Sequence, residues 1–258
     1  MTNDDLLELL VATAAAVERA VGKVSGRDRR ARTDRAGQYA IDLVADAAAL
    51  DVLGRAPVAV LSEESGWGGR AGAPITVVID PVDGSTNASR HIPYWATSLC
   101  ALDRDGPLAA LVVNQATGVT TMAVRGGGAF RDGEPIAPWK VERVEDALVA
   151  LSGRPGRWLP WKQFRALGSA ALSLCDLAAG ALDGLIDGGA WHAAWDYLGG
   201  LLICREAGAE VIDAAGRELV ITDPTARRQI LAAATPALLE ELRPALPTPG
   251  VPTGSDPT

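Results

Sequence analysis

A strand that runs directly into two aspartates is the feature of this sequence that most limits how the chain can fold. Residues 75–79 read Ile-Thr-Val-Val-Ile and are all β-branched, which favours a buried strand. Asp80, Pro81, Val82 and Asp83 follow at once. Because the proline stiffens the chain, we expect both carboxylates to project from one strand end. Mg²⁺ prefers oxygen ligands at this density, so the fold must place a candidate cation site here.

The residues around the second aspartate suit an anion. Gly84 allows the backbone to approach a ligand closely, and the N–H groups of Gly84 and Ser85 can point at phosphate oxygens. The Ser85 hydroxyl is placed to orient a water molecule, and the carbonyl of Val82 is turned outward as a further metal ligand. An ordinary polar turn would explain one aspartate and the glycine, but not the whole string. The pattern therefore predicts a metal site that holds a phosphate group.

The composition indicates a large apolar interior in an acidic protein. The 258 residues are 48% hydrophobic, which suits one large α/β domain or two smaller ones that share a core. The net charge of -8 repels the phosphate backbone of nucleic acids, so we expect no nucleic-acid polymer as a partner. The apolar runs are too short to span a membrane, so we expect no membrane partner either.

Cysteine usage and the first residues indicate a cytoplasmic location. Cys100, Cys175 and Cys204 are far apart and odd in number, and each lies in an apolar run. This pattern predicts three buried free thiols, which fit a reducing compartment. The chain begins with polar and acidic residues and has no basic region typical of a signal peptide.

The order of apolar patterns predicts helices, then a mostly antiparallel sheet, then a βαβα-like half. Helical periodicity covers 6–21 and 43–50, and strand-like runs cover 58–61, 75–79, 97–102, 108–113 and 119–124. The second half is predicted to hold strands at 147–151 and 229–234 and helices at 169–182, 195–207 and from Pro236 onward. Residues 244–258 contain five prolines without a hydrophobic pattern, which predicts a disordered tail.

The segment 25–36 carries five arginines and no apolar periodicity. We expect an exposed loop there. Two interpretations remain open: the loop is a lid that attracts phosphate, or its charges are simply solvated.

Four stretches, in the same order, resemble the inositol monophosphatase family. Asp80-Pro81-Val82-Asp83-Gly84-Ser85-Thr86-Asn87 resembles its first signature, with Ser85 in place of the usual threonine. Ser62-Glu63-Glu64-Ser65 resembles the family's Gly-Glu-Glu-Ser. Gly168-Ser169-Ala170-Ala171 resembles a stretch that lines the substrate site, and Trp195-Asp196-Tyr197-Leu198 through Gly208 resembles the second signature. The resemblance covers nearly all of 6–242.

This resemblance implies a layered αβαβα sandwich, as in the fructose-1,6-bisphosphatase superfamily, and a homodimer. It divides the chain into an N-terminal α+β half at 1–140 and a C-terminal α/β half at 141–243. It also implies two or three Mg²⁺ ions and inhibition by lithium. The implied metal ligands are Glu63, Asp80, the carbonyl of Val82, Asp83 and Asp196. The implied catalytic residues are Ser85, Asp42 and Glu63, and the implied substrate contacts are Gly84, Ser85, Thr86, Gly168, Ser169, Ala170 and Asp187.

Several assignments keep alternatives open. Asp46 lies four residues after Asp42 on the same helical face and is the other candidate for the site acid. Asp196 at a helix start is typical of a cap as well as of a ligand. Glu64 and His192 are candidates for contact with metal or substrate.

These features predict Mg²⁺-dependent hydrolysis of a small soluble phosphate monoester. Family members act on inositol phosphates, histidinol phosphate, sugar phosphates such as fructose 1,6-bisphosphate, or 3'-phosphoadenosine 5'-phosphate. Here the stretch between Asp183 and Asp196 is about two residues longer than in the inositol enzymes, and Ala88 replaces an aromatic residue. The alternative of another class is a non-catalytic binder or sensor of a phosphorylated metabolite, which would need a broken ligand set.

Overall fold

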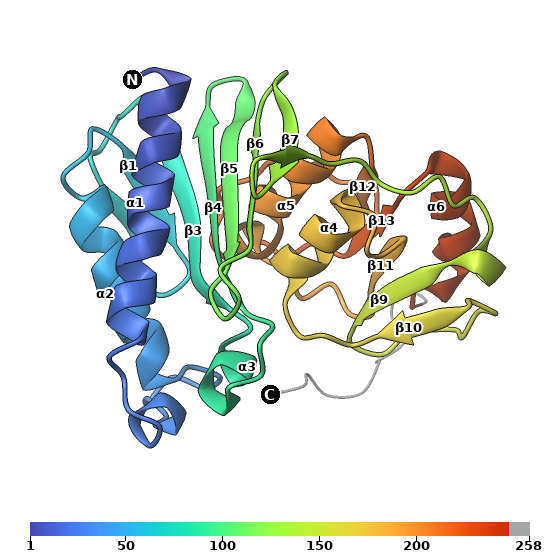
Figure 1. Cartoon of the computed structure of the whole chain (residues 1–258), viewed down its shortest axis with the longest axis horizontal. Helices are drawn as coiled ribbons and strands as arrows, with labels where there is room; N and C mark the ends of the chain where they lie inside the picture. Colours follow the sequence, from blue (N-terminus) through green and yellow to red (C-terminus); the bar gives the residue numbers. More distant parts are fainter. Residues whose placement is uncertain (248–258) are drawn as a thin grey trace.

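Two β-sheets and three groups of helices alternate in five layers (Figure 1). The structure is a computed structural model, and it describes residues 1–247. Helices α1 and α2 cover the outer face of the larger sheet, α4 and α5 lie between the sheets, and α6 packs outside the smaller one. The predicted αβαβα sandwich is confirmed. In the described part of the chain, no helix is long and apolar enough to cross a membrane.

The larger sheet has the strand order β2-β1-β3-β4-β5-β6-β7-β8. Its strands and the helices of the same half are α1 (Asn3–Val21), α2 (Ala40–Leu53), β1 (Ala59–Ser62), β2 (Gly66–Gly69), β3 (Thr76–Asp83), α3 (Ser85–Arg90), β4 (Ala96–Asp103), β5 (Gly106–Asn114), β6 (Thr120–Val124), β7 (Gly128–Arg131) and β8 (Glu134–Pro135). The pair β1 and β3 is parallel, and all other neighbouring pairs of this sheet are antiparallel. The mostly antiparallel first half is thus confirmed.

The smaller sheet has the order β10-β9-β11-β13-β12. The elements of this half are β9 (Leu148–Ser152), β10 (Gln163–Arg165), α4 (Ala170–Ala178), β11 (Gly184–Asp187), α5 (Ala194–Ala207), β12 (Glu210–Asp213), β13 (Ile230–Ala233) and α6 (Pro236–Leu242). Helix α4 ends earlier than the predicted 182, because Gly180 adopts a left-handed φ of 74° just after its last turn. Short 3₁₀ turns cover Asp28–Arg30, Val144–Asp146 and Arg243–Ala245.

Three apolar clusters form the core between the layers. Leu6, Leu10 and Val17 fall on one stripe of α1 and pack against the outer face of the larger sheet. The inner face packs against α4 and α5, and this apolar layer also contains the buried free thiols of Cys100, Cys175 and Cys204. Because both sheets share the α4–α5 layer, we propose 1–140 and 141–243 as two halves of one folded body.

The predicted disordered tail does not hold for its first residues. The 3₁₀ turn Arg243–Ala245 buries Ala245 beside α6, and the carbonyl of Ala245 accepts the backbone N–H of Gly156 at 2.8 Å. Burial and a backbone hydrogen bond order this stretch although its sequence is rich in proline. The rest of the predicted tail, 248–258, lies outside the described residues.

Candidate active site

Asp80 and Asp83 line the same cavity because β3 is bulged between them. Asp80 pairs with Ser98 of β4 and Asp83 with Ala96, so three steps along β3 match two along β4. In a regular strand, residues three apart point to opposite faces, and the extra residue removes this alternation. The Thr97 hydroxyl donates to the carbonyl of Pro81 at 2.9 Å and holds the bulge. The strand therefore continues through Pro81, where the sequence suggested a turn.

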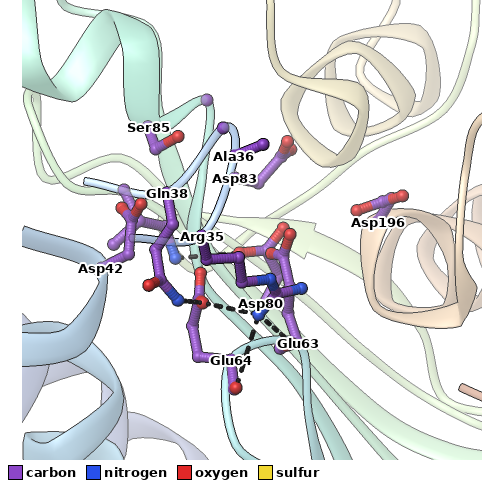
Figure 2. Close-up of a pocket in the computed structure, with 13 residues that line it drawn as sticks. Arg35, Ala36, Gln38, Asp42, Glu63, Glu64, Asp80, Asp83, Ser85 and Asp196 are labelled. Atoms are coloured by element: carbon purple, nitrogen blue, oxygen red, sulfur yellow. Dashed lines mark hydrogen bonds and ion pairs between the residues drawn. The ribbon is translucent and has the colours of Figure 1, made fainter. Parts of the chain in front are cut away.

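Glu63 and Asp196 join Asp80 from two other elements (Figure 2). Glu63 directly follows β1, which runs parallel to β3, so the carboxyl ends of both strands meet at one sheet edge. Asp196 lies in the first turn of α5. One carboxylate oxygen from each of the three residues lies within 4.8 Å of the other two. The three predicted metal ligands therefore converge, and Asp83 and Val82 line the same cavity of about 210 Å³.

The electrostatics of this cluster favour a bound cation. Burial raises the pKa of Asp80 well above its ordinary value, and the neighbouring charges of Glu63 and Asp83 raise it further. The pKa of Glu63 is raised in the same way, by burial and then by Asp196. Buried carboxylates that repel one another are stabilised when a cation lies between them. An all-oxygen donor set of this kind fits Mg²⁺.

Asp83 is held by the start of α4. Its Oδ2 accepts the Ser169 hydroxyl at 2.6 Å and the Ala171 backbone N–H at 2.8 Å. The Ser169 oxygen also accepts the N–H of Leu172 and thereby caps α4. Burial raises the pKa of Asp83 to about 6, and these two hydrogen bonds oppose the rise. Ser169 therefore orients one oxygen of Asp83.

Asp196 caps a helix and also reaches the carboxylate cluster. Its Oδ2 accepts the backbone N–H of Ala193 at 2.7 Å and so caps α5. The same residue supplies an oxygen to the carboxylate cluster. The choice between cap and ligand is thus not exclusive.

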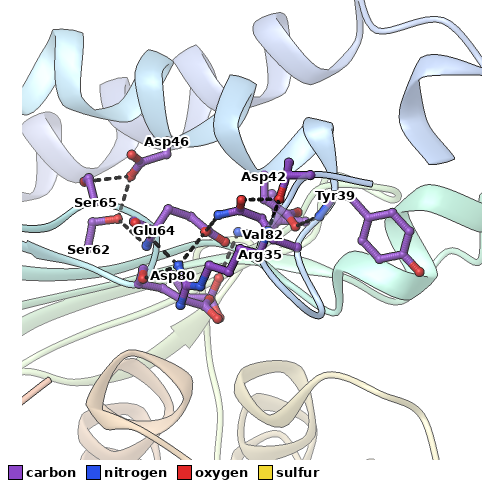
Figure 3. A network of polar contacts seen from close by, with 12 residues as sticks. Arg35, Tyr39, Asp42, Asp46, Ser62, Glu64, Ser65, Asp80 and Val82 are labelled. Atoms are coloured by element: carbon purple, nitrogen blue, oxygen red, sulfur yellow. Dashed lines mark hydrogen bonds and ion pairs between the residues drawn. The ribbon is translucent and has the colours of Figure 1, made fainter. Parts of the chain in front are cut away.

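The structure distinguishes Asp42 from Asp46 (Figure 3). Asp46 Oδ1 accepts the hydroxyls of Ser62 at 2.5 Å and Ser65 at 3.4 Å, which ties α2 to the end of β1. Asp42 lines the cavity, and its Oδ2 accepts the N–H of Tyr39 at 2.8 Å. Its Oδ1 is buried without a hydrogen-bond partner among the described residues. Burial raises the pKa of Asp42 to about 7. Asp42, not Asp46, is therefore the acid that lies at the site.

Ser85 begins α3 and lines the cavity together with Asp42. In the view of Figure 2 the two side chains lie on the same side of the cavity, with Asp196 across from them. The hydrogen bonds of the described residues include none between Ser85 and Asp42. Both side chains nevertheless line the cavity.

Gly84 is the residue that the local backbone demands, and its replacement tests this. Its φ is 92°, and a Cβ atom there would lie 2.8 Å from the carbonyl oxygen of Gly168 and 3.2 Å from that of Tyr94. We expect Gly84→Ala to lower the free energy of unfolding by about 2 kcal/mol through backbone strain and this clash. Urea unfolding compared with Gly118→Ala, also at positive φ (80°) but with open space around it, separates the clash from the strain. Equal losses in both variants would contradict the close approach at Gly84.

A second cavity of about 340 Å³ adjoins the first, and Asp83 lines both. Its lining includes four of the predicted substrate contacts, namely Thr86, Gly168, Ser169 and Ala170. Gly84 and Ser85 line the first cavity. The predicted substrate contacts other than Asp187 therefore line one or the other of these two cavities.

Asp187 does not lie where a substrate contact was predicted. It has no exposed surface, and its two oxygens accept the N–H groups of Gly189 at 2.9 Å and Trp191 at 3.3 Å. Both carboxylate oxygens are hydrogen-bonded within the turn that follows β11. The prediction that Asp187 contacts the substrate is therefore wrong for this structure. The sequence could not show this, because the longer stretch up to Asp196 obscured the alignment.

His192 lies between two acids and lines the second cavity. Nδ1 is 3.5 Å from Asp196 Oδ2, and Nε2 is 3.9 Å from Asp187 Oδ2. Burial opposes a charge on the imidazole, but the hydrogen bond to Asp196 and the charge of Asp187 outweigh burial and raise the pKa of His192 to about 9. The imidazole of His192 therefore contacts the carboxylate of Asp196 from the side of the second cavity.

Two residues at or just after the end of the arginine-rich segment line the site, although the sequence did not predict them as site residues. Arg35 and Gln38 line the first cavity and both contact Glu64. Nothing in the run of arginines distinguishes Arg35 from its neighbours, because the distinction depends on the turn that brings it back over β1. Arg29 and Arg30 instead donate to backbone carbonyls of α3.

Comparison with known proteins adds an independent line of evidence. The model of the inositol monophosphatase family matches residues 4–248. A fructose-1,6-bisphosphatase/inositol-1-monophosphatase from Archaeoglobus fulgidus is 34% identical over 229 residues, which cover 85% of this chain and 88% of that protein. A fructose-1,6-bisphosphatase from Pyrococcus furiosus is 32% identical over 205 residues, covering 78% and 80%.

A solved structure from Pyrococcus horikoshii, described as having similarities for inositol-1 monophosphatase, superimposes with a TM-score of 0.87. It is 26% identical, and the match covers 96% of this chain and all of that one. Sequence, fold and the convergence of the carboxylates agree. The chain is a phosphoric monoester hydrolase that belongs to the inositol monophosphatase family.

Proposed function

We propose that this protein hydrolyses a small phosphate monoester with Mg²⁺ as its cofactor. The observation that carries the proposal is the convergence of Glu63, Asp80, Asp83 and Asp196 on one buried cavity. Glu63, Asp80 and Asp196 would hold one cation, and Asp83 and the carbonyl of Val82, which line the same cavity, would supply ligands to a further one. Bound divalent cations lower the pKa of an attacking water and offset the charge of the phosphate.

The protein's own groups orient the reactants. We propose that Asp42, with one oxygen free, accepts the Ser85 hydroxyl when substrate is bound, so that Ser85 orients the attacking water. Asp83 is kept in place by Ser169 and Ala171, which leaves its Oδ1 for a cation. The alcohol part of the substrate would extend into the second cavity past Thr86 and Gly168.

The substrate is proposed to be a sugar or inositol phosphate. Two relatives bear the names fructose-1,6-bisphosphatase and fructose-1,6-bisphosphatase/inositol-1-monophosphatase, which supports this class. The test is phosphate release from fructose 1,6-bisphosphate, inositol 1-phosphate, histidinol phosphate and 3'-phosphoadenosine 5'-phosphate, each with Mg²⁺ or with EDTA. Release that persists in EDTA would contradict the metal assignment. Binding without release from every compound would favour the non-catalytic sensor.

Lithium should inhibit the enzyme. The carboxylate cluster holds more than one proposed cation position, and a position with few ligands exchanges its ion after product forms. Li⁺ has a radius similar to that of Mg²⁺ but a single charge, so it can occupy such a position without activating water. We expect steady-state phosphate release to fall in LiCl and to stay unchanged in NaCl of equal ionic strength. Identical curves in the two salts would show that no cation exchanges during turnover.

The assembly state and location also stay proposals. We propose a homodimer in the cytoplasm, supported by the family resemblance and by three cysteines that are all buried as free thiols. Light scattering tests the first: a monomeric mass would contradict it.

A further inference from the structure

Arg35 is the one basic residue among the described residues that line the first cavity. The same cavity is lined by six carboxylate side chains, those of Asp42, Glu63, Glu64, Asp80, Asp83 and Asp196. A phosphate monoester is a dianion near neutral pH, so it enters a strongly negative surrounding. Apart from bound cations, the side chain of Arg35 is therefore the positively charged group that lines the first cavity, whereas His192 lines the second.

The guanidinium of Arg35 is attached to the chain by one of its nitrogens. Nη1 lies 3.2 Å from Glu64 Oε2, and it donates to the carbonyls of Glu63 at 3.4 Å and Glu64 at 3.5 Å. The contacts of the described residues do not use Nε or Nη2. The Arg35 side chain is 53% exposed, whereas that of Glu64 is 7% exposed. Arg35 thus has an anchored nitrogen and further N–H donors that remain available to a ligand.

Glu64 holds both ends of a short turn (Figure 2). Its Oε2 accepts the side-chain amide of Gln38 as well as the guanidinium of Arg35. Between these residues Gly37 adopts a φ of 83°, and the N–H of Gln38 donates to the carbonyl of Arg35 at 3.2 Å. Burial raises the pKa of Glu64, and the contacts with Gln38 and Arg35 oppose this rise. The nearly buried carboxylate of Glu64 thus receives its hydrogen bonds from Arg35 and Gln38.

Glu64 also stands apart from the candidate metal ligands. The cluster of three carboxylates that can hold a cation includes the neighbouring residue Glu63 but not Glu64. In Figure 2 the Glu64 side chain contacts Gln38 and Arg35, while the carboxylates of Glu63 and Asp80 lie together. Adjacent glutamates at one strand end therefore differ in what they contact.

We propose that Arg35 binds the phosphate group of the substrate, and that Glu64 and Gln38 are positioning residues that hold Arg35 over the cavity. This inference rests on the proposed function of the site. Arginine presents N–H donors in a planar fork that matches phosphate oxygens, so a guanidinium fixed at one nitrogen can offer another edge to the ligand. Glu64 serves the loop and not a metal ion.

The test uses six variants of the full chain: Arg35→Met, Arg35→Lys, Glu64→Gln, the double variant Arg35→Met/Glu64→Gln, Glu63→Gln for comparison of Mg²⁺ binding, and the control Arg27→Met. Arg27 is an exposed arginine at the start of the same loop, and its removal changes the net charge equally. The affinity for inorganic phosphate is measured by calorimetry at saturating Mg²⁺. The affinity for Mg²⁺ alone is measured in parallel.

Arg35→Met should weaken phosphate binding by about 10- to 100-fold, as expected for loss of a charge-assisted hydrogen bond. Arg35→Lys should recover part of this loss, because it keeps the charge but not the fork. Glu64→Gln should weaken phosphate binding by about 3- to 10-fold, and the double variant should match Arg35→Met, because Glu64 acts through Arg35. Mg²⁺ binding should not weaken in Arg35→Met, because the variant removes a positive charge.

Three results would overturn the inference. One is equal phosphate affinity in Arg35→Met and Arg27→Met. Another is a double variant in which the two losses add, which would mean that Glu64 acts independently of Arg35. The last is a loss of Mg²⁺ affinity in Glu64→Gln as large as that in Glu63→Gln, which would make Glu64 a metal ligand. A wild-type protein that releases no phosphate from any substrate and binds none would instead contradict the proposed function itself.

Discussion

Asp83→Asn should reduce kcat/KM for phosphate release by about 1000-fold or more, a loss of about 4 kcal/mol of transition-state stabilisation. The structure gives a specific reason for so large an effect. Ser169 and Ala171 both donate to Oδ2 of Asp83, so an asparagine would turn its carbonyl oxygen toward them. Its amide NH₂ would then face the carboxylate cavity in place of Oδ1. A donor group would stand where a cation needs a ligand.

The fold should survive this change, because both hydrogen bonds to α4 are retained. The measurement is steady-state phosphate release over a range of Mg²⁺ concentrations, together with thermal unfolding of the variant. Asp51→Asn is the matched control, since Asp51 is an exposed acid on α2 that pairs with Arg55. Activity of Asp83→Asn that returns to the wild-type level at saturating Mg²⁺ would sink the assignment.

Mg²⁺ should raise the melting temperature of the protein, and Asp80→Asn should remove most of this effect. A ligand at 100 times its dissociation constant stabilises the folded state by about 2.7 kcal/mol. For a chain of this length such a gain corresponds to roughly 5–10 °C. Asp80 is the most buried carboxylate of the cluster with Glu63 and Asp196, and its Oδ1 also accepts the N–H of Val82 at 2.9 Å, a bond that asparagine can keep.

The same variant should have the opposite effect on the metal-free protein. Removing one charge from a buried cluster of like charges relieves repulsion, so we expect Asp80→Asn to melt at a higher temperature than the wild type in EDTA. Differential scanning calorimetry with EDTA and with MgCl₂ checks both signs in one experiment. Wild-type protein that melts at the same temperature in both buffers would argue against a cation at this cluster.

The motif residues, the main helices and the longer strands could be predicted from the sequence because they depend on local patterns. The β-branched run at 75–79 forms the buried part of β3, and the apolar stripe of 6–21 is the buried face of α1. The string from Asp80 to Asn87 carries its chemistry within eight residues, so its role did not depend on knowing the fold. All five predicted metal ligands accordingly line one cavity.

Local patterns were insufficient wherever two candidates looked alike. Asp42 and Asp46 share a helical face. Only the tertiary structure shows that Asp46 accepts hydrogen bonds from Ser62 and Ser65 at the end of β1. Asp187 appeared available in the sequence, yet the turn after β11 uses both of its oxygens.

The sequence by itself thus determined the main helices and the longer strands, the carboxylates that line one cavity and the class of chemistry, but it did not show the short strands β2, β7, β8, β10, β11 and β12. The tertiary structure decided how these groups face one another. The bulge between Asp80 and Asp83 depends on pairing with β4, and the selection of Arg35 from five arginines depends on its contact with Glu64. The physical reason is that hydrophobic periodicity and turn chemistry act between near neighbours, whereas hydrogen-bond partners are assigned by segments distant in the chain.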